Sequence, residues 1–137
     1  MKVTVTHAPT EAEKDFVLKG IQEFNRARFE KAGFKELAVF SENEAGERVA
    51  GLTGVLRGDW LFIHLLWVRE EERGKGIGRD LLRKAEEEGR AFGCRFAFVD
   101  TFEFQAPDFY VKEGYREVYS MLVHEETGRH FYYTKSL

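Results

Sequence analysis

The stretch that decides the fold is Val68-Arg69-Glu70-Glu71-Glu72-Arg73-Gly74-Lys75-Gly76-Ile77-Gly78. It follows an almost wholly apolar run of nine residues, Trp60–Val68, which is typical of a strand buried on both faces. After it, apolar residues recur at helical spacing from about Gly76 to Phe92. The sequence therefore predicts a buried strand, a glycine-rich turn and a long helix, in that order.

The glycine-rich turn has the sequence features of an anion-binding site. Glycines at 74, 76 and 78 let the backbone approach a ligand closely and adopt angles barred to other residues. The helix that starts there presents unpaired N–H groups and the positive end of its dipole. Arg73, Lys75 and Arg79 add positive charge at the rim. A diphosphate is a natural occupant of such a turn.

Three alternative interpretations of this turn are a P-loop, a dinucleotide-binding fingerprint and a turn that serves packing alone. A P-loop requires Gly-Lys-Ser/Thr at the helix start, and here Lys75 is followed by Gly76. A dinucleotide fingerprint requires glycine where Arg79 stands, although Asp100 lies at about the distance expected of a ribose-binding acid, ~20 residues on. A turn that only permits close packing of a helix on a strand is a third reading.

Two motifs in the right order carry a family resemblance. Arg73-x-x-Gly76-x-Gly78 resembles the R/Q-x-x-G-x-G/A signature of the GNAT superfamily of acyl-CoA-dependent N-acetyltransferases. Downstream, Ala106–Tyr115 resembles that family's A-x-x-F-Y-x-K-x-G-F/Y segment. The resemblance covers Trp60–Tyr115. It implies a single α/β domain of GNAT type spanning residues 1–137, with a mixed, mostly antiparallel central sheet and helices on both faces.

The resemblance also implies acetyl-CoA as cosubstrate. The pyrophosphate would sit on backbone N–H groups of the turn, and the pantetheine arm would lie between the splayed ends of Trp60–Val68 and Arg95–Phe104. One N–H near Leu66–Val68 would polarise the thioester carbonyl. Gln105 would bind the pantetheine or adenosine side. The expected cofactor-binding residues are Leu66, Trp67, Val68, Arg73, Gly74, Lys75, Gly76, Ile77, Gly78, Arg79 and Gln105.

Three residues are candidates for the proton transfers. Tyr110 matches the family's general acid, and a tyrosine with a pKa near ~10 is protonated at neutral pH and can donate to a departing thiolate. The less favoured alternative is that Tyr110 fills core space beside Phe109. His64 shares a predicted strand face with Leu66 and is a candidate base or relay, or a histidine merely hydrogen-bonded in place. Glu103 is a candidate base through water, or an exposed carboxylate at the strand edge.

The implied reaction is direct attack of a primary amine on the acetyl thioester in a ternary complex. The acceptor is a small-molecule or peptide amine. The alternative is a non-catalytic sensor or structural module that only holds acyl-CoA. Relatives often pair, so a homodimer is an open arrangement.

Composition limits the remaining classes. The chain has 137 residues, which suits one domain, and its net charge of −3 argues against a nucleic-acid partner. Cys94 is alone, and His7, His124 and His130 show no ligand spacing, so we expect no disulfide and no metal. No signal peptide or membrane span is visible, so we expect a cytoplasmic protein without a membrane partner.

The other predicted elements surround this centre. Expected strands are Lys2–Thr6, Leu37–Ser41, Arg48–Leu56, Arg95–Phe104, Tyr115–His124 and His130–Lys135, with a short helix at Ala106–Lys112. Thr10 and Glu13 resemble a capping box at the start of a first helix. Gly51 and Gly54, inside the strand at Arg48–Leu56, are expected to mark a bulge or a close backbone approach. Glu86 and Arg90 are expected on the solvated side of the long helix.

Overall fold

The computed structural model describes residues 1–137, which fall into two compact units, Met1–Ala32 and Gly33–Leu137. The first unit contains helix α1, Glu11–Ala32. The expected capping box is confirmed, since the Thr10 N–H donates to Glu13 Oε1 at 2.9 Å and the Glu13 N–H donates to Thr10 Oγ1 at 3.1 Å. The strand expected at Lys2–Thr6 is wrong, because alternation does not make a strand where the backbone has no pairing partner.

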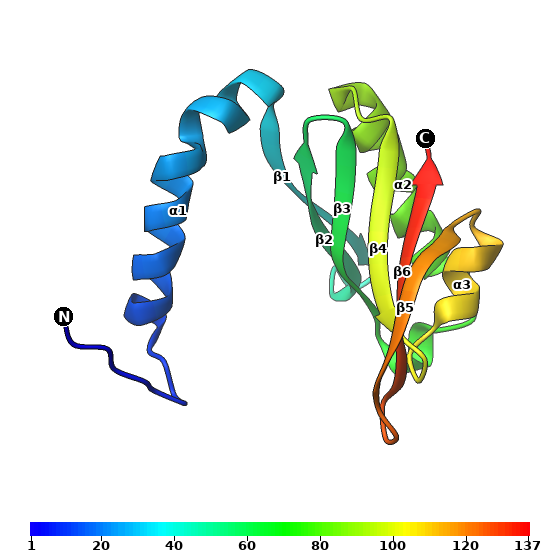
Figure 1. The fold of residues 1–137 in the computed structure, drawn as a ribbon. Coiled ribbons are helices and arrows are strands. Elements are labelled where there is room, and N and C mark those ends of the chain that lie inside the picture. The colour runs from blue at the N-terminus through cyan, green and yellow to red at the C-terminus, as the bar shows by residue number, and fades with distance from the viewer. The chain divides into compact units, whose positions relative to one another are not determined.

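The second unit is built on a six-stranded sheet in the order β1-β2-β3-β4-β6-β5 (Figure 1). Only β3 and β4 run parallel, and every other neighbouring pair is antiparallel. This confirms the mixed, mostly antiparallel sheet. The strands are β1 Phe34–Glu42, β2 Arg48–Arg57, β3 Trp60–Val68, β4 Phe96–Phe102, β5 Arg116–His124 and β6 Gly128–Ser136.

Helices α2, Ile77–Phe92, and α3, Pro107–Lys112, pack on the same face of this sheet. Their apolar side chains join the inward residues of the strands in one core. Its members are Ala50, Leu52, Leu56, Leu61, Ile63, Leu81, Leu82, Ala85, Cys94, Ala97, Val99, Tyr110, Tyr115 and Tyr133. Within Gly33–Leu137 the two helices therefore cover one face of the sheet.

Within Gly33–Leu137, strand β3 is buried on one face, so this unit by itself does not bury both faces as the sequence suggested. Leu61 and Ile63 point into the core, whereas Leu65 and Trp67 are 69% and 55% exposed. An apolar strand has both faces covered only where a layer packs on each side, and α2 and α3 supply only one. The run of apolar residues therefore identified the strand correctly, and Gly33–Leu137 alone covers only one of its faces.

A bulge interrupts the pairing of β2 with β3. Gly54 pairs with Ile63 and Thr53 with Leu65, so His64 has no partner residue in the ladder. A Cβ on Gly54 would run into the backbone carbonyl oxygen of Phe62, so only glycine allows the strands to come this close. The predicted close approach at Gly54 is confirmed.

Glu86 lies inside the protein, not on the solvated side of α2. It is 2% exposed and accepts hydrogen bonds from the Tyr115 hydroxyl at 2.8 Å and the Lys135 ammonium at 3.0 and 3.1 Å. The buried carboxylate is tolerated there because the Lys135 ammonium compensates its charge and the Tyr115 hydroxyl donates a further hydrogen bond. This cluster ties α2 to the start of β5 and the end of β6.

Candidate active site

The turn between β3 and α2 keeps the open backbone predicted for it. A short 3-10 turn, Glu70–Glu72, comes first, and Gly74 and Gly76 follow at φ values of 78° and 82°, where a side chain would be strained. Gly76 is the N-cap of α2 and no side chain caps the helix. The first N–H groups of α2 therefore point out of the helix end with no capping acceptor.

The charged residues of the turn are held near this helix end. The Arg73 Nε donates to the Val68 carbonyl oxygen at 2.9 Å, which folds the side chain back on the end of β3. The Lys75 ammonium pairs with Glu72 at 2.9 Å. Arg79 pairs with Asp80 and its guanidinium lies where a Cβ of Gly76 would be. The cations thus rim the turn, two of them beside a carboxylate.

Beyond the middle of the sheet the two parallel strands stop pairing. The β3–β4 ladder runs from Trp60 and Phe96 to Ile63 and Val99 and ends there. After that point β3 stays paired with β2, and β4 stays paired with β6. The facing edges of the two strands are left without a backbone partner, at the level of the β3 bulge. Unpaired N–H and C=O groups at such edges suit an extended ligand.

Of the expected strand contacts, Leu66 and Val68 pack against the core and Trp67 is exposed. The alternation that was expected to put His64 on the same face as Leu66 fails at the bulge. His64 is exposed, so that expectation is wrong because one extra residue changes the side-chain direction.

Tyr110 is the most buried of the candidate catalytic residues. It is 7% exposed, meets the rings of Phe109 and Tyr115 edge-on at 5.0 and 5.9 Å, and stacks with Tyr133 at 6.4 Å. Burial, and then the negative charge of Asp100, raise the pKa of Tyr110 to about 12. The hydroxyl is therefore protonated at neutral pH, as a proton donor must be.

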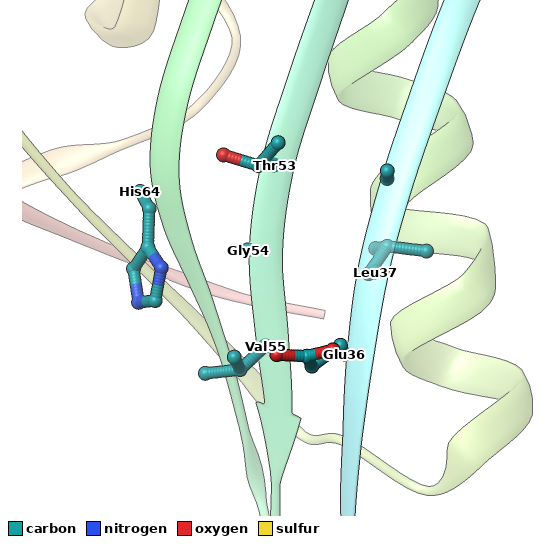
Figure 2. A pocket seen from close by; sticks show the side chains of 7 residues that line it. Glu36, Leu37, Thr53, Gly54, Val55 and His64 are labelled. Atoms are coloured by element: carbon teal, nitrogen blue, oxygen red, sulfur yellow. The ribbon is translucent and has the colours of Figure 1, made fainter. Parts of the chain in front are cut away.

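His64 lies apart from Tyr110, beside a shallow pocket of about 390 Å³ over β1, β2 and β3. Figure 2 shows the side chains of His64 and Glu36 coming from β3 and β1 on either side of β2. Thr53, Gly54 and Val55 line the pocket between them. The pocket is therefore lined by a histidine from β3 and a carboxylate from β1, with β2 between them.

Glu103 and Gln105 follow the end of β4. The Glu103 N–H donates to the Arg129 carbonyl oxygen at 2.8 Å, while its side chain lies exposed beside Gly128. The Gln105 Oε1 accepts from the Phe102 N–H at 2.7 Å and from the Thr101 hydroxyl at 3.1 Å. The carbonyl of Gln105 thus braces its own loop, and its amide NH₂ is the group left to meet a ligand.

The sequence did not predict the contact between Asp100 and His130. His130 Nε2 lies 2.7 Å from Asp100 Oδ2, and the His130 ring stacks with Phe102 and Tyr132 at 4.2 and 4.6 Å. The sequence marked Asp100 only as a potential ribose ligand and His130 only as a histidine without metal-ligand spacing. Their separation of 30 residues gives no local signal, and only the β4–β6 register brings them together.

No group of three or more His, Cys, Asp or Glu side chains is placed to hold a metal ion. No helix combines the length and the apolar character needed to cross a membrane.

Comparisons with known proteins agree on one family. The family described as Acetyltransferase (GNAT) matches residues 8–115. Blasticidin-S acetyltransferase of Streptomyces morookaense is 44% identical over 80 residues, which are 58% of this chain and 59% of that protein, so the match spans less than two thirds of its length. Acetyltransferase Atu2258 of Agrobacterium fabrum is 35% identical over 114 residues, 83% of this chain and 82% of that protein.

The fold gives the same answer. A crystal structure from Agrobacterium tumefaciens, described as that of an acetyltransferase, superposes with a TM-score of 0.90 and 27% identity, covering 100% of both chains. The family match over residues 8–115 and the 35% identity over 83% of the chain show that the chain belongs to the acetyltransferase (GNAT) family.

Proposed function

We propose that this protein transfers the acetyl group of acetyl-CoA to a primary amine by direct attack in a ternary complex. The single observation that carries the proposal is that the uncapped N-terminus of α2 comes shortly after β3 in the chain, and that the facing edges of β3 and β4 are unpaired beyond Ile63 and Val99. The first suits the pyrophosphate of CoA and the second suits its extended pantetheine arm.

The cofactor residues are proposed on this basis. Backbone N–H groups of Gly74, Gly76 and Gly78 would bind the pyrophosphate, with Arg73, Lys75, Ile77 and Arg79 completing the turn. A Cβ on Gly78 would make only ordinary contacts, at 3.6 Å from Val68 and 3.7 Å from Phe109. Packing within the protein therefore does not demand glycine at this position, which favours a ligand as the reason for it. Leu66, Trp67 and Val68 would line the arm, and Gln105 would meet it with its amide.

Tyr110 is the proposed general acid. The amine nitrogen forms a bond to the thioester carbonyl carbon, and the carbon–sulfur bond then breaks, so the sulfur leaves as a thiolate. Tyr110 gives the thiolate a proton. The acceptor ammonium loses one proton before it attacks as the free amine and a second after the bond forms, and of these two protons one ends on the CoA thiol and the other in water. The pKa of Tyr110, raised to about 12 by burial and by Asp100, supports a donor that stays protonated throughout the neutral range.

The acceptor is proposed to be a small cationic amine. The relative from Streptomyces morookaense is named for acetylation of blasticidin S, and the alignment with it covers 58% of this chain. Blasticidin S is therefore the first acceptor to assay, alongside polyamines, aminoglycosides, lysine and peptide N-termini.

The test is release of free CoA thiol from acetyl-CoA with each acceptor, next to a melting curve. Acetyl-CoA at 100 times its Kd should stabilise the fold by ~2.7 kcal/mol, while NAD and ATP at the same concentration should do much less. Equal stabilisation by NAD would refute the assignment of acetyl-CoA as the cosubstrate. Stabilisation by acetyl-CoA with no turnover of any amine would favour the second candidate, a module that binds acyl-CoA without catalysis.

A further inference from the structure

We propose that Asp100 accepts the proton of the attacking amine and that His130 positions it for this role. The proposal rests on the proposed function, because it names the base for that reaction.

Asp100 is the first residue of β4 after the parallel ladder ends at Val99. Alternation puts Asp100 on the face of the sheet opposite α2 and α3, because its neighbours Val99 and Thr101 are 2% and 5% exposed and point toward the helices. Its side chain is 40% exposed. The carboxylate is therefore both accessible and beside the point where the strands separate.

His130 fixes the carboxylate. A carboxylate only accepts hydrogen bonds, so the His130 Nε2–H donates to Asp100 Oδ2 over 2.7 Å. The His130 side chain is 15% exposed, stacks with Phe102 and Tyr132, and has its Nδ1 3.4 Å from the Tyr132 hydroxyl. With both ring nitrogens so occupied, His130 suits positioning, and the second oxygen of Asp100 is the group left to receive a proton.

Asp100 and Tyr110 lie on opposite faces of the sheet. Tyr110 comes from α3 on the helical face, and after burial the negative charge of Asp100 is the second cause that raises the pKa of Tyr110. An amine attacking a thioester held between the strand edges would pass its proton to Asp100 on one face. The departing thiolate would take a proton from Tyr110 on the other. The acid and the base are thus separated by the sheet and do not exchange protons directly.

The step balances. The acceptor ammonium gives one proton to the Asp100 carboxylate, the free amine adds to the thioester carbon, and collapse of the intermediate expels the CoA sulfur. The second proton from nitrogen reaches the sulfur by way of Tyr110. Asp100 returns its proton to water. The titratable groups around the pair are the Tyr132 hydroxyl on β6, Tyr119 beyond it on β5, and Tyr110 on α3.

The experiment compares kcat, KM and pH profiles of Asp100→Asn with those of the unchanged protein, using the best acceptor from the panel. General base assistance is typically worth ~10²–10⁴-fold, so kcat of Asp100→Asn should fall by at least about 100-fold near neutral pH. The deficit should shrink as the pH approaches the acceptor's own pKa, because the amine then needs no base. Acetyl-CoA affinity and melting temperature should stay unchanged. Asp59→Asn, in the turn before β3, is the matched control and should keep full activity.

His130 is tested with two variants. His130→Phe keeps an aromatic ring but has no N–H for Asp100, and should lose kcat by roughly tenfold or more. His130→Gln can still donate to Asp100 and should recover part of that loss, which a purely structural role would not produce. Unchanged kcat in Asp100→Asn, or a loss confined to the acceptor KM or equal at every pH, would overturn the assignment of Asp100 while leaving the acetyltransferase intact. Failure of the unchanged protein to acetylate any amine would overturn the proposed function and this inference with it.

Discussion

Removing the ammonium from the buried Glu86 cluster should destabilise the protein severely. Lys135→Met keeps the length of the side chain but leaves the 2% exposed Glu86 carboxylate with only the Tyr115 hydroxyl as partner. Loss of one member of a buried charge pair is worth ~3–5 kcal/mol, because the remaining charge is no longer compensated. For a protein of this size we expect a drop of roughly 10–20 °C in melting temperature.

The matched control is Lys84→Met. Lys84 pairs with Glu87 at 3.3 Å, but their side chains are 56% and 63% exposed, so this substitution should change the free energy of unfolding by less than ~0.5 kcal/mol. Both variants are measured by urea and thermal unfolding. Equal, small losses would refute the view that Glu86 depends on its ammonium partner.

A double variant tests the same reasoning from the other side. Glu86→Gln together with Lys135→Met leaves no buried charge, while the glutamine oxygen can still accept from Tyr115. The double variant should therefore be more stable than Lys135→Met alone, with a coupling energy of ~1–3 kcal/mol. Simple additivity of the two single changes would contradict a direct charge interaction.

Three further outcomes follow from the site and its supports. Tyr110→Phe should fold and bind acetyl-CoA nearly as well but lose at least about tenfold in kcat, and an unchanged kcat would remove Tyr110 from the mechanism. In Gly54→Ala the new Cβ meets the Phe62 carbonyl oxygen, so the free energy of unfolding should fall by more than ~1 kcal/mol and kcat should fall because the bulge straightens. In Gly51→Ala the closest contact is the movable Phe40 ring, so both losses should be smaller. Burial raises the folded-state pKa of Tyr110 and Tyr115 above the unfolded-state value of ~10. Their contribution to the free energy of unfolding is therefore full below about pH 10 and should fall as the pH rises toward 12. A melting temperature that stays flat across that range would contradict this prediction.

The elements themselves were largely predictable because their signals are local. Trp60–Val68 is strand β3 to the residue, and the helix expected from Gly76 is α2 with Gly76 as its N-cap. The end expected at about Phe92 is also confirmed, with Gly93 as the C-cap of α2 at a φ of 111°. Each of these depends on a few neighbouring residues whose conformational preferences decide the outcome without distant partners.

Glu86 shows how a local signal can be outweighed. Reading it with Arg90 as a solvated pair followed a sound helix rule. Yet Glu86 lies four residues after Leu82 and three before Gly89, which places it on the same face as the buried residues of α2. The helical phase therefore indicated burial, and what the sequence could not supply were its partners, 29 and 49 residues away.

The same distinction divides the candidate site. The glycine turn is one contiguous segment, so its residues and their order already predict an anion-binding helix start. Asp100 and His130 meet only because β4 and β6 pair with Asp100 opposite Tyr132 and Phe102 opposite His130. A shift of that register by one residue would turn one of the two side chains to the helical face and separate them. The proposed proton acceptor is therefore a property of strand pairing, and the turn that would bind the cofactor is a property of local sequence.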